Sequence, residues 1–86
     1  MGLDTVELVM AYEDAFGTKI PNAIAANLLT PGDVIDHIVC QLRERGEQPE
    51  RDIVANTVRA LTLEQLGLNP IHYREDARFI EDFGAD

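Results

Sequence analysis

Three long segments with apolar residues at helical spacing, separated by breaks that contain glycine or proline, constrain this chain most strongly. They lie at about 3–16, 30–45 and 51–66, and their apolar side chains recur every three or four residues rather than at alternate positions. A shorter segment within 20–27 can add one or two helical turns. These patterns predict an all-α fold, a bundle of three long helices with an extra short one.

Two of the predicted helix ends carry local signals. Thr30 can cap a first turn, Pro31 suits the first helical position, and Asp33 stands at the spacing of a capping box. Gly67 follows the third long segment and is a typical helix stop. The residues from 68 to 86 show no clean period and are predicted to form a long loop.

Each long segment has a face that the helical spacing predicts to be buried. The loop after the third segment has apolar residues of its own, which are expected to pin it onto the bundle. The predicted core consists of Leu8, Ala11, Tyr12, Ala15 and Phe16 with Val9 at its edge; Val34, Ile35, Ile38, Val39 and Leu42; Ile53, Val54, Thr57, Val58 and Leu61; and the anchors Phe79, Ile80 and Phe83.

The first segment also carries a second apolar stripe, nearly opposite its core face. A small bundle has no second core for this stripe to contact, so its side chains are predicted to lie at the surface. Such an apolar stripe with an acidic border is a candidate docking face for partner proteins. The stripe comprises Leu3, Val6 and Met10, and its border comprises Glu7, Glu13 and Asp14.

Length and charge narrow the classes of function. A chain of 86 residues with 45% apolar content makes one domain, residues 1–86, with one modest core. Its 16 acidic and 7 basic residues give a formal net charge of -9, which disfavours binding to nucleic acid or to an anionic membrane. The charge suits partner proteins with basic patches, and equally suits simple solubility.

Cysteine usage and the N-terminal sequence bear on location. The single cysteine, Cys40, allows no disulfide within the chain. Residues 1–4 lack the basic and apolar stretches of a signal peptide, and no apolar run approaches membrane-spanning length. The cytoplasm is therefore the expected location.

Several stretches resemble acyl carrier proteins. Residues 3–11 resemble the recognition helix of that family, 16–21 the loop after it, and 30–38 its last helix. Residues 64–67 and 79–86 resemble the first helix and first loop, which precede the recognition helix in the family but come last here. The resemblance implies a circularly permuted carrier fold with the family's helices in the order 2-3-4-1: helices two to four in 3–45, a connector at 46–50, and helix one with its loop in 51–86.

The resemblance also implies a cofactor, since family members carry acyl groups on 4'-phosphopantetheine that is esterified to a serine. This chain contains no serine. The matching attachment position is Gly2, or the gap between Asp86 and the N-terminus. Asp86, Leu3 and Asp4 flank the lost motif, and without the serine the two acids read as solvated groups near a helix start. No cofactor is therefore expected to be attached.

Other chemical sites are not supported by the spacing. His37 and His72 have no cysteine partner at zinc spacing, so no metal site is predicted. Cys40 and His37 could be read as a nucleophile and a base, but a thiol with acidic neighbours is disfavoured as a thiolate. The chain is therefore not expected to be an enzyme.

Two functions remain open. The first is a non-catalytic interaction or accessory module that binds proteins with basic or apolar docking patches, among them acyl-transfer or fatty-acid and polyketide synthesis enzymes. The second is a functional acyl carrier of lipid or polyketide metabolism whose serine is supplied by another chain or a longer product. This chain would then be a fragment or a swapped half, and a domain-swapped dimer stays open as an oligomeric arrangement.

Overall fold

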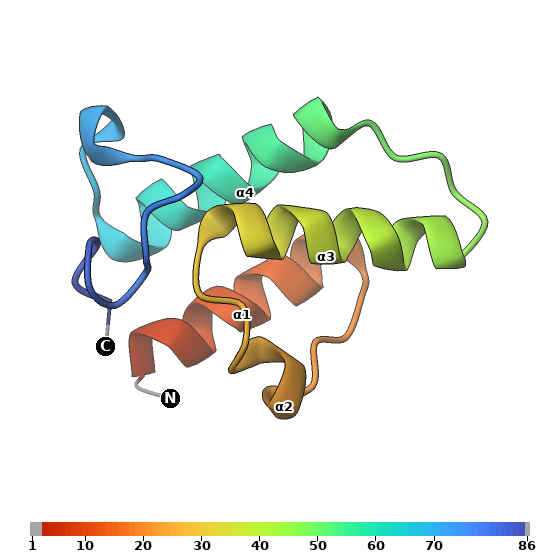
Figure 1. The fold of residues 1–86 in the computed structure, drawn as a ribbon, viewed down its shortest axis with the longest axis horizontal. Coiled ribbons are helices and arrows are strands. Elements are labelled where there is room, and N and C mark those ends of the chain that lie inside the picture. Colours follow the sequence, from red (N-terminus) through yellow and green to blue (C-terminus); the bar gives the residue numbers. More distant parts are fainter. Residues whose placement is uncertain (1–2, 86) are drawn as a thin grey trace.

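The computed structural model describes residues 3–85, and these fold into helices joined by loops. The elements are α1 (Leu3–Phe16), α2 (Asn22–Ala25), α3 (Pro31–Glu44), α4 (Arg51–Leu66) and the 3-10 turn η1 (Pro70–His72). The described part of the chain contains four α-helices and no strand, which confirms the all-α prediction (Figure 1). Within that part, no helix is long and apolar enough to cross a membrane.

The start of α3 and the end of α4 lie where their sequence signals predicted them. The Thr30 hydroxyl accepts a hydrogen bond from the Asp33 amide at 3.1 Å, and the Asp33 carboxylate accepts one from the Thr30 amide at 3.2 Å. This capping box satisfies backbone groups that the first turn of α3 leaves without a helical partner. Gly67 ends α4 in the left-handed conformation, with φ of 63°, which glycine adopts without steric cost.

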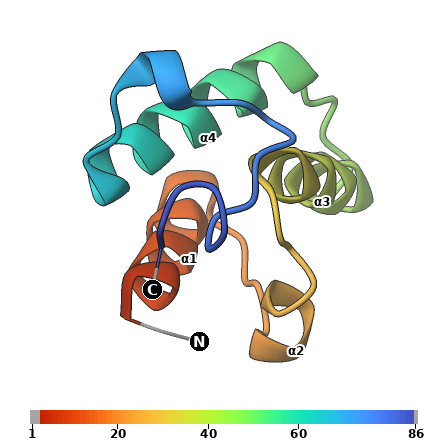
Figure 2. The ribbon, with the colours of Figure 1, turned by 60° about the vertical axis from the view of Figure 1, so that its left-hand side comes forward.

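The three long helices form the body of the molecule. Both α1 and α3 pack against α4. In Figure 1, α4 runs in the opposite sense to α1 and α3, while α2 forms a short step between α1 and α3 (Figures 1 and 2). The packing of α1 against α4 is therefore antiparallel.

The core is built from the predicted face of each helix, with three corrections. Ala15, Ile53 and Ile80 were predicted to be buried but are exposed, Ile53 and Ile80 at 61% each. Their neighbours fill the core instead, because Val54 packs between the helices and Phe79 anchors the C-terminal loop, whereas Ile53 and Ile80 lie at the surface. The buried apolar core includes Leu8, Tyr12, Ile20, Val34, Ile35, Ile38, Val39, Leu42, Val54, Val58 and Phe79.

One polar pair crosses this core. The hydroxyls of Tyr12 on α1 and Thr62 on α4 lie 2.6 Å apart, and both residues are buried. The Thr62 hydroxyl donates to the Val58 carbonyl at 2.7 Å, so Tyr12 is the donor in the bond between the hydroxyls. Burial raises the pKa of Tyr12 above its usual range, which keeps the hydroxyl protonated and able to donate.

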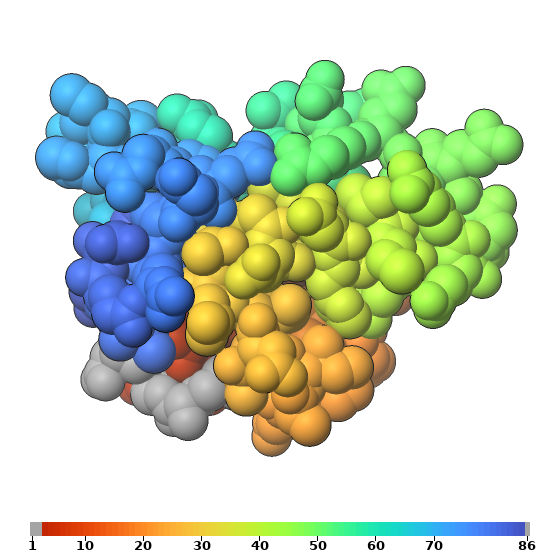
Figure 3. Space-filling model, in the orientation of Figure 1, coloured from red at the N-terminus to blue at the C-terminus, as the bar shows by residue number. Residues whose placement is uncertain are grey.

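The C-terminal loop is tied to the start of α3. The amide of Phe79 donates to the Leu29 carbonyl at 3.0 Å, and the amide of Gly32 donates to the Glu75 carbonyl at 2.8 Å. Arg51, at the start of α4, pairs with Asp36 at 3.2 Å and with Glu75 at 2.8 Å. In Figure 3 the C-terminal segment, in blue, lies directly against the start of α3, in yellow. The loop therefore belongs to the packed body of the protein.

Aromatic contacts hold the rest of this loop. Tyr73 and Phe83 stack with ring centroids 5.9 Å apart, and Phe79 meets Phe83 edge to face at 6.2 Å. Arg59 of α4 lies over the Tyr73 ring at 5.8 Å. Burial, together with the nearby Glu75 carboxylate, raises the pKa of Tyr73 to about 12. These contacts fasten the loop to α4 as well as to α3.

Candidate functional site

The exposed stripe on α1 is the first element of the candidate site. Leu3, Val6 and Met10 are exposed at 68%, 38% and 55%, while Leu8 and Tyr12 on the other side of the same helix are buried. The surface position predicted for these three side chains is confirmed. Their use in docking remains a prediction.

The acidic border of the stripe is less uniform than the sequence suggested. Asp14 and Glu7 are exposed, and the Glu7 carboxylate accepts a hydrogen bond from Gln65 of α4 at 3.1 Å. Glu13 is half-buried, and its carboxylate accepts a bond from the backbone amide of Ile20 at 2.7 Å. Glu13 therefore holds the loop between α1 and α2, and the exposed acids of the border are Glu7 and Asp14.

The start of α1 lies beside the end of the C-terminal loop, as both ribbon views show (Figures 1 and 2). Leu3 is exposed and Asp4 is half-exposed in the first turn of the helix. Ala85, at the other end of the described chain, is buried and donates its amide to the Phe79 carbonyl at 2.8 Å. Gly2 and Asp86, the other residues assigned to the lost motif, lie outside the described residues.

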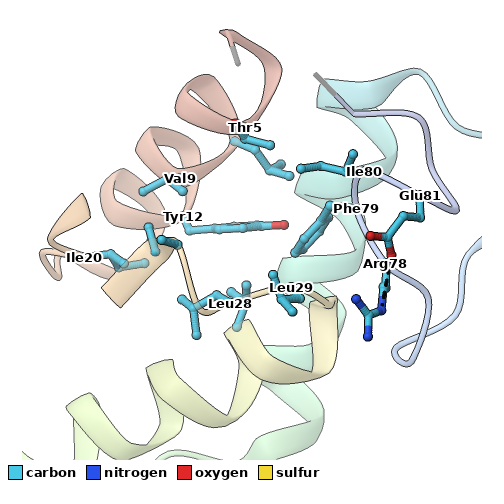
Figure 4. Close-up of a pocket in the computed structure, with 14 residues that line it drawn as sticks. Thr5, Val9, Tyr12, Ile20, Leu28, Leu29, Arg78, Phe79, Ile80 and Glu81 are labelled. Atoms are coloured by element: carbon cyan, nitrogen blue, oxygen red, sulfur yellow. Dashed lines mark ion pairs between the residues drawn. The ribbon is translucent and has the colours of Figure 1, made fainter. Parts of the chain in front are cut away.

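A pocket opens next to this junction, and the sequence patterns did not predict it. It has a volume of about 110 Å³ and is lined mainly by apolar side chains of α1, of the segment before α3 and of the C-terminal loop. Figure 4 shows Val9 and Tyr12 facing Phe79 and Ile80 across it. Arg78 and Glu81 lie at its edge and form an ion pair at 3.3 Å. The pocket suits a small apolar group.

The sequence contains the apolar residues that line this pocket, but their positions along the chain do not indicate that they form a site. Leu28 and Leu29 are consecutive apolar residues before the α3 cap, and both line the pocket. Phe79 was predicted only as an anchor. The contact between Leu29 and Phe79 joins residues fifty positions apart, and no local period could have shown it.

The hydroxyl groups of the chain have structural roles wherever their bonds are described. Thr30 caps α3, Thr62 bonds to Tyr12 and Val58, and Thr57 donates to the Ile53 carbonyl at 3.1 Å. Thr5 lines the pocket from the first turn of α1. The residues present therefore do not fit the attachment of 4'-phosphopantetheine in the family's manner, because the chain has no serine to supply the ester oxygen.

Metal-binding and thiol chemistry find no support in the geometry. Among residues 3–85, no group of three or more His, Cys, Asp or Glu side chains lies close enough together to hold a metal ion. The exposed Cys40 thiol lies 3.6 Å from the Glu44 carboxylate.

Comparison with known proteins adds a partial relationship. The chain is 56% identical over 36 residues to the acyl carrier protein of Sinorhizobium fredii, and equally to the acyl carrier protein AcpP of Rhizobium meliloti. This part of the chain is homologous to acyl carrier proteins. The match covers 42% of this chain and 46% of each relative, so the chain spans about half the length of the curated acyl carrier proteins that it matches.

The other comparisons found nothing. No family model matches the chain, and no solved structure matches it either. The acyl carrier relationship therefore rests on the matched 36 residues and agrees with the helical fold.

Proposed function

We propose that this chain is an acyl-carrier-like interaction module that docks to partner proteins through α1 and has no catalysis of its own. The observation that carries the proposal is the stripe of Leu3, Val6 and Met10, which is exposed on a helix whose opposite side builds the core. Homology of part of the chain to acyl carrier proteins supports it. The expected partners are enzymes of acyl transfer or of fatty-acid and polyketide synthesis.

The charge of the molecule supports the same mode of binding. A net charge of -9 attracts basic surfaces at long range, and exposed acids such as Glu7 and Asp14 border the stripe. In such a contact, charge raises the rate of encounter and the apolar side chains supply the buried area. A partner with a basic rim around an apolar hollow therefore fits this face.

A permuted chain order is part of the proposal. The end of the described C-terminal loop lies beside the start of α1, which is where a carrier's first loop would meet its recognition helix. The connector 46–50 joins the end of α3 to the start of α4. This arrangement supports a carrier fold in which the attachment motif is interrupted and the connector 46–50 joins the family's last helix to its first.

A docking measurement tests the proposal. Immobilised ketosynthase that accepts acyl carrier proteins should bind the purified chain, and Val6→Asp should weaken the binding by roughly fivefold or more, because it places a charge in the apolar contact. The matched control is Ile71→Asp, since Ile71 is 77% exposed on η1, away from the stripe. Both variants should stay within about 1 kcal/mol of the original free energy of unfolding. Equal binding by both variants would contradict the proposal that α1 is the docking face.

A second candidate function is a working carrier whose serine comes from another chain or a longer product. The apolar pocket favours it, because a module that only docks has no need of a hollow beside the junction of its ends. If the chain is part of such a carrier, the pocket would bind an apolar group that the carrier holds nearby.

Intact-mass measurement tests a premise that the two candidates share, namely that this chain alone accepts no cofactor arm. The purified chain is incubated with coenzyme A and a promiscuous phosphopantetheinyl transferase, with an ordinary acyl carrier protein as the positive control. The interaction module should gain no mass. An added mass of roughly 340 Da on this chain alone, the size of the cofactor arm, would show an unexpected acceptor and contradict both candidates.

A further inference from the structure

A second hollow lies at the other end of the bundle, where α3 ends and α4 begins. It is a groove of about 410 Å³, larger than the pocket beside α1, and is lined by Phe16, Leu42, Ile53, Val54 and the connector residues 47–50. Figure 1 shows the connector at the opposite end of the molecule from the start of α1. The groove is therefore separate from the junction of the chain ends.

The floor and lip of the groove are apolar. Leu42 and Val54 are buried in the core, and Phe16 is half-buried at the end of α1. Ile53 is 61% exposed, although helical spacing predicted it to be buried. Single exposed isoleucines are common on protein surfaces, but Ile53 continues the apolar lining of a groove, whereas Ile71 lines neither hollow. Ile53 thus offers contact area that the chain itself leaves uncovered.

The charged residues that line the groove are both acidic. Glu47 forms an ion pair with Arg45, which neutralises part of its charge. Glu50 is exposed and precedes α4, and its side chain does not cap that helix. Together with the net charge of -9, Glu50 gives the groove a negative edge that favours cationic groups.

We propose that this groove binds a partner segment that carries a large apolar side chain next to lysine or arginine. The apolar side chain would enter the floor over Leu42 and Val54 and contact Ile53, while the basic group would pair with Glu50. A second copy of the chain fits this site poorly, because two molecules with a charge of -9 repel one another. The groove is thus a second contact surface, independent of the α1 stripe.

Nuclear magnetic resonance titration tests this inference. The isotope-labelled chain is titrated with a short amidated peptide of leucine and lysine, and with the same peptide carrying glutamate in place of lysine. The lysine peptide alone should shift the amide signals of Phe16, Leu42 and 47–54. Ile53→Asp should weaken its affinity roughly tenfold, Glu50→Lys should weaken it several-fold, and Ile71→Asp should leave it unchanged.

Several results would overturn the inference. The inference would be contradicted by shifts confined to α1, by an equal response to the glutamate peptide, or by unchanged affinity in both groove variants. Groove signals that change with protein concentration alone would also contradict it, because they indicate a second copy in the groove. Circular dichroism of each variant checks folding, and if Ile53→Asp does not fold, Glu50→Lys decides. Val6→Asp should not alter the affinity of the lysine peptide.

Discussion

Tyr12 links two helices that are far apart in the sequence. Its ring is buried against the core and lines the pocket, and its hydroxyl reaches Thr62 across the interface between α1 and α4. A buried hydroxyl is costly unless it has a partner, so the pair favours one alignment of the two helices over others.

A double-mutant cycle measures this link. Tyr12→Phe should lower the free energy of unfolding by about 1 kcal/mol through loss of the hydrogen bond, and Thr62→Val should lower it by about 1–3 kcal/mol, because it leaves the Tyr12 hydroxyl buried without an acceptor. The double variant should cost less than the sum, since both polar groups are then gone. Urea denaturation of the four proteins gives the values, and strictly additive costs would show that the two hydroxyls are not coupled.

Single residues also show which side-chain positions could not be predicted from the sequence. Helical spacing placed Ile53 in the core as readily as Val54, because it specifies a face but not where the opposing element ends. Ile80, in the loop, was expected to be an anchor like its neighbour Phe79. Glu13 was predicted at the docking border, yet its carboxylate binds the Ile20 amide. The loop that brings this amide to Glu13 turns on Gly17 and has no period to interpret.

At the scale of the elements, α3 has the most strongly specified start. Thr30, Pro31 and Asp33 each satisfy a separate requirement of a first helical turn, and the Asp33 carboxylate also accepts a bond from the Leu29 amide at 3.0 Å. Leu29 lines the pocket and accepts the bond from Phe79. The cap of α3 therefore also orders one wall of the pocket.

Removal of the cap should be measurable. Thr30→Ala should lower the free energy of unfolding by about 1 kcal/mol, the usual cost of losing such a cap. Thr57→Ala, in the interior of α4, is the matched control and should change it by no more than about 0.5 kcal/mol. Urea denaturation compares the two, and an equal effect of both variants would mean that the capping box contributes nothing to stability.

The helices were predictable because their signals are local. The breaks between segments, the cap at Thr30 and the stop at Gly67 lie within a few residues of the ends that they determine, and the two opposite stripes of the first segment indicated one buried and one exposed side. The pocket and the groove were not predictable. Their walls come from different helices and loops, and their shape depends on how far apart these elements stand.

At the scale of the whole molecule, the closeness of the described end of the C-terminal loop to the start of α1 allows a direct test of the permutation. A variant in which one serine joins Asp86 to Leu3, with the chain reopened within 46–50, should keep the fold and present serine at the start of α1. Phosphopantetheinyl transferase should then add roughly 340 Da to it. The matched control carries alanine at the joining position and should gain no mass. A folded serine variant that also gains none would contradict the permuted-carrier proposal.

The long-range contacts also determine the order in which the protein can fold as it is made. Tyr12 finds its partner at Thr62, and Leu29 receives the Phe79 amide fifty residues later. While the ribosome has released only the first three helices, their apolar faces have no α4 to pack against. The core is therefore completed late in synthesis, and until then the nascent chain exposes surface that chaperones recognise and that promotes aggregation.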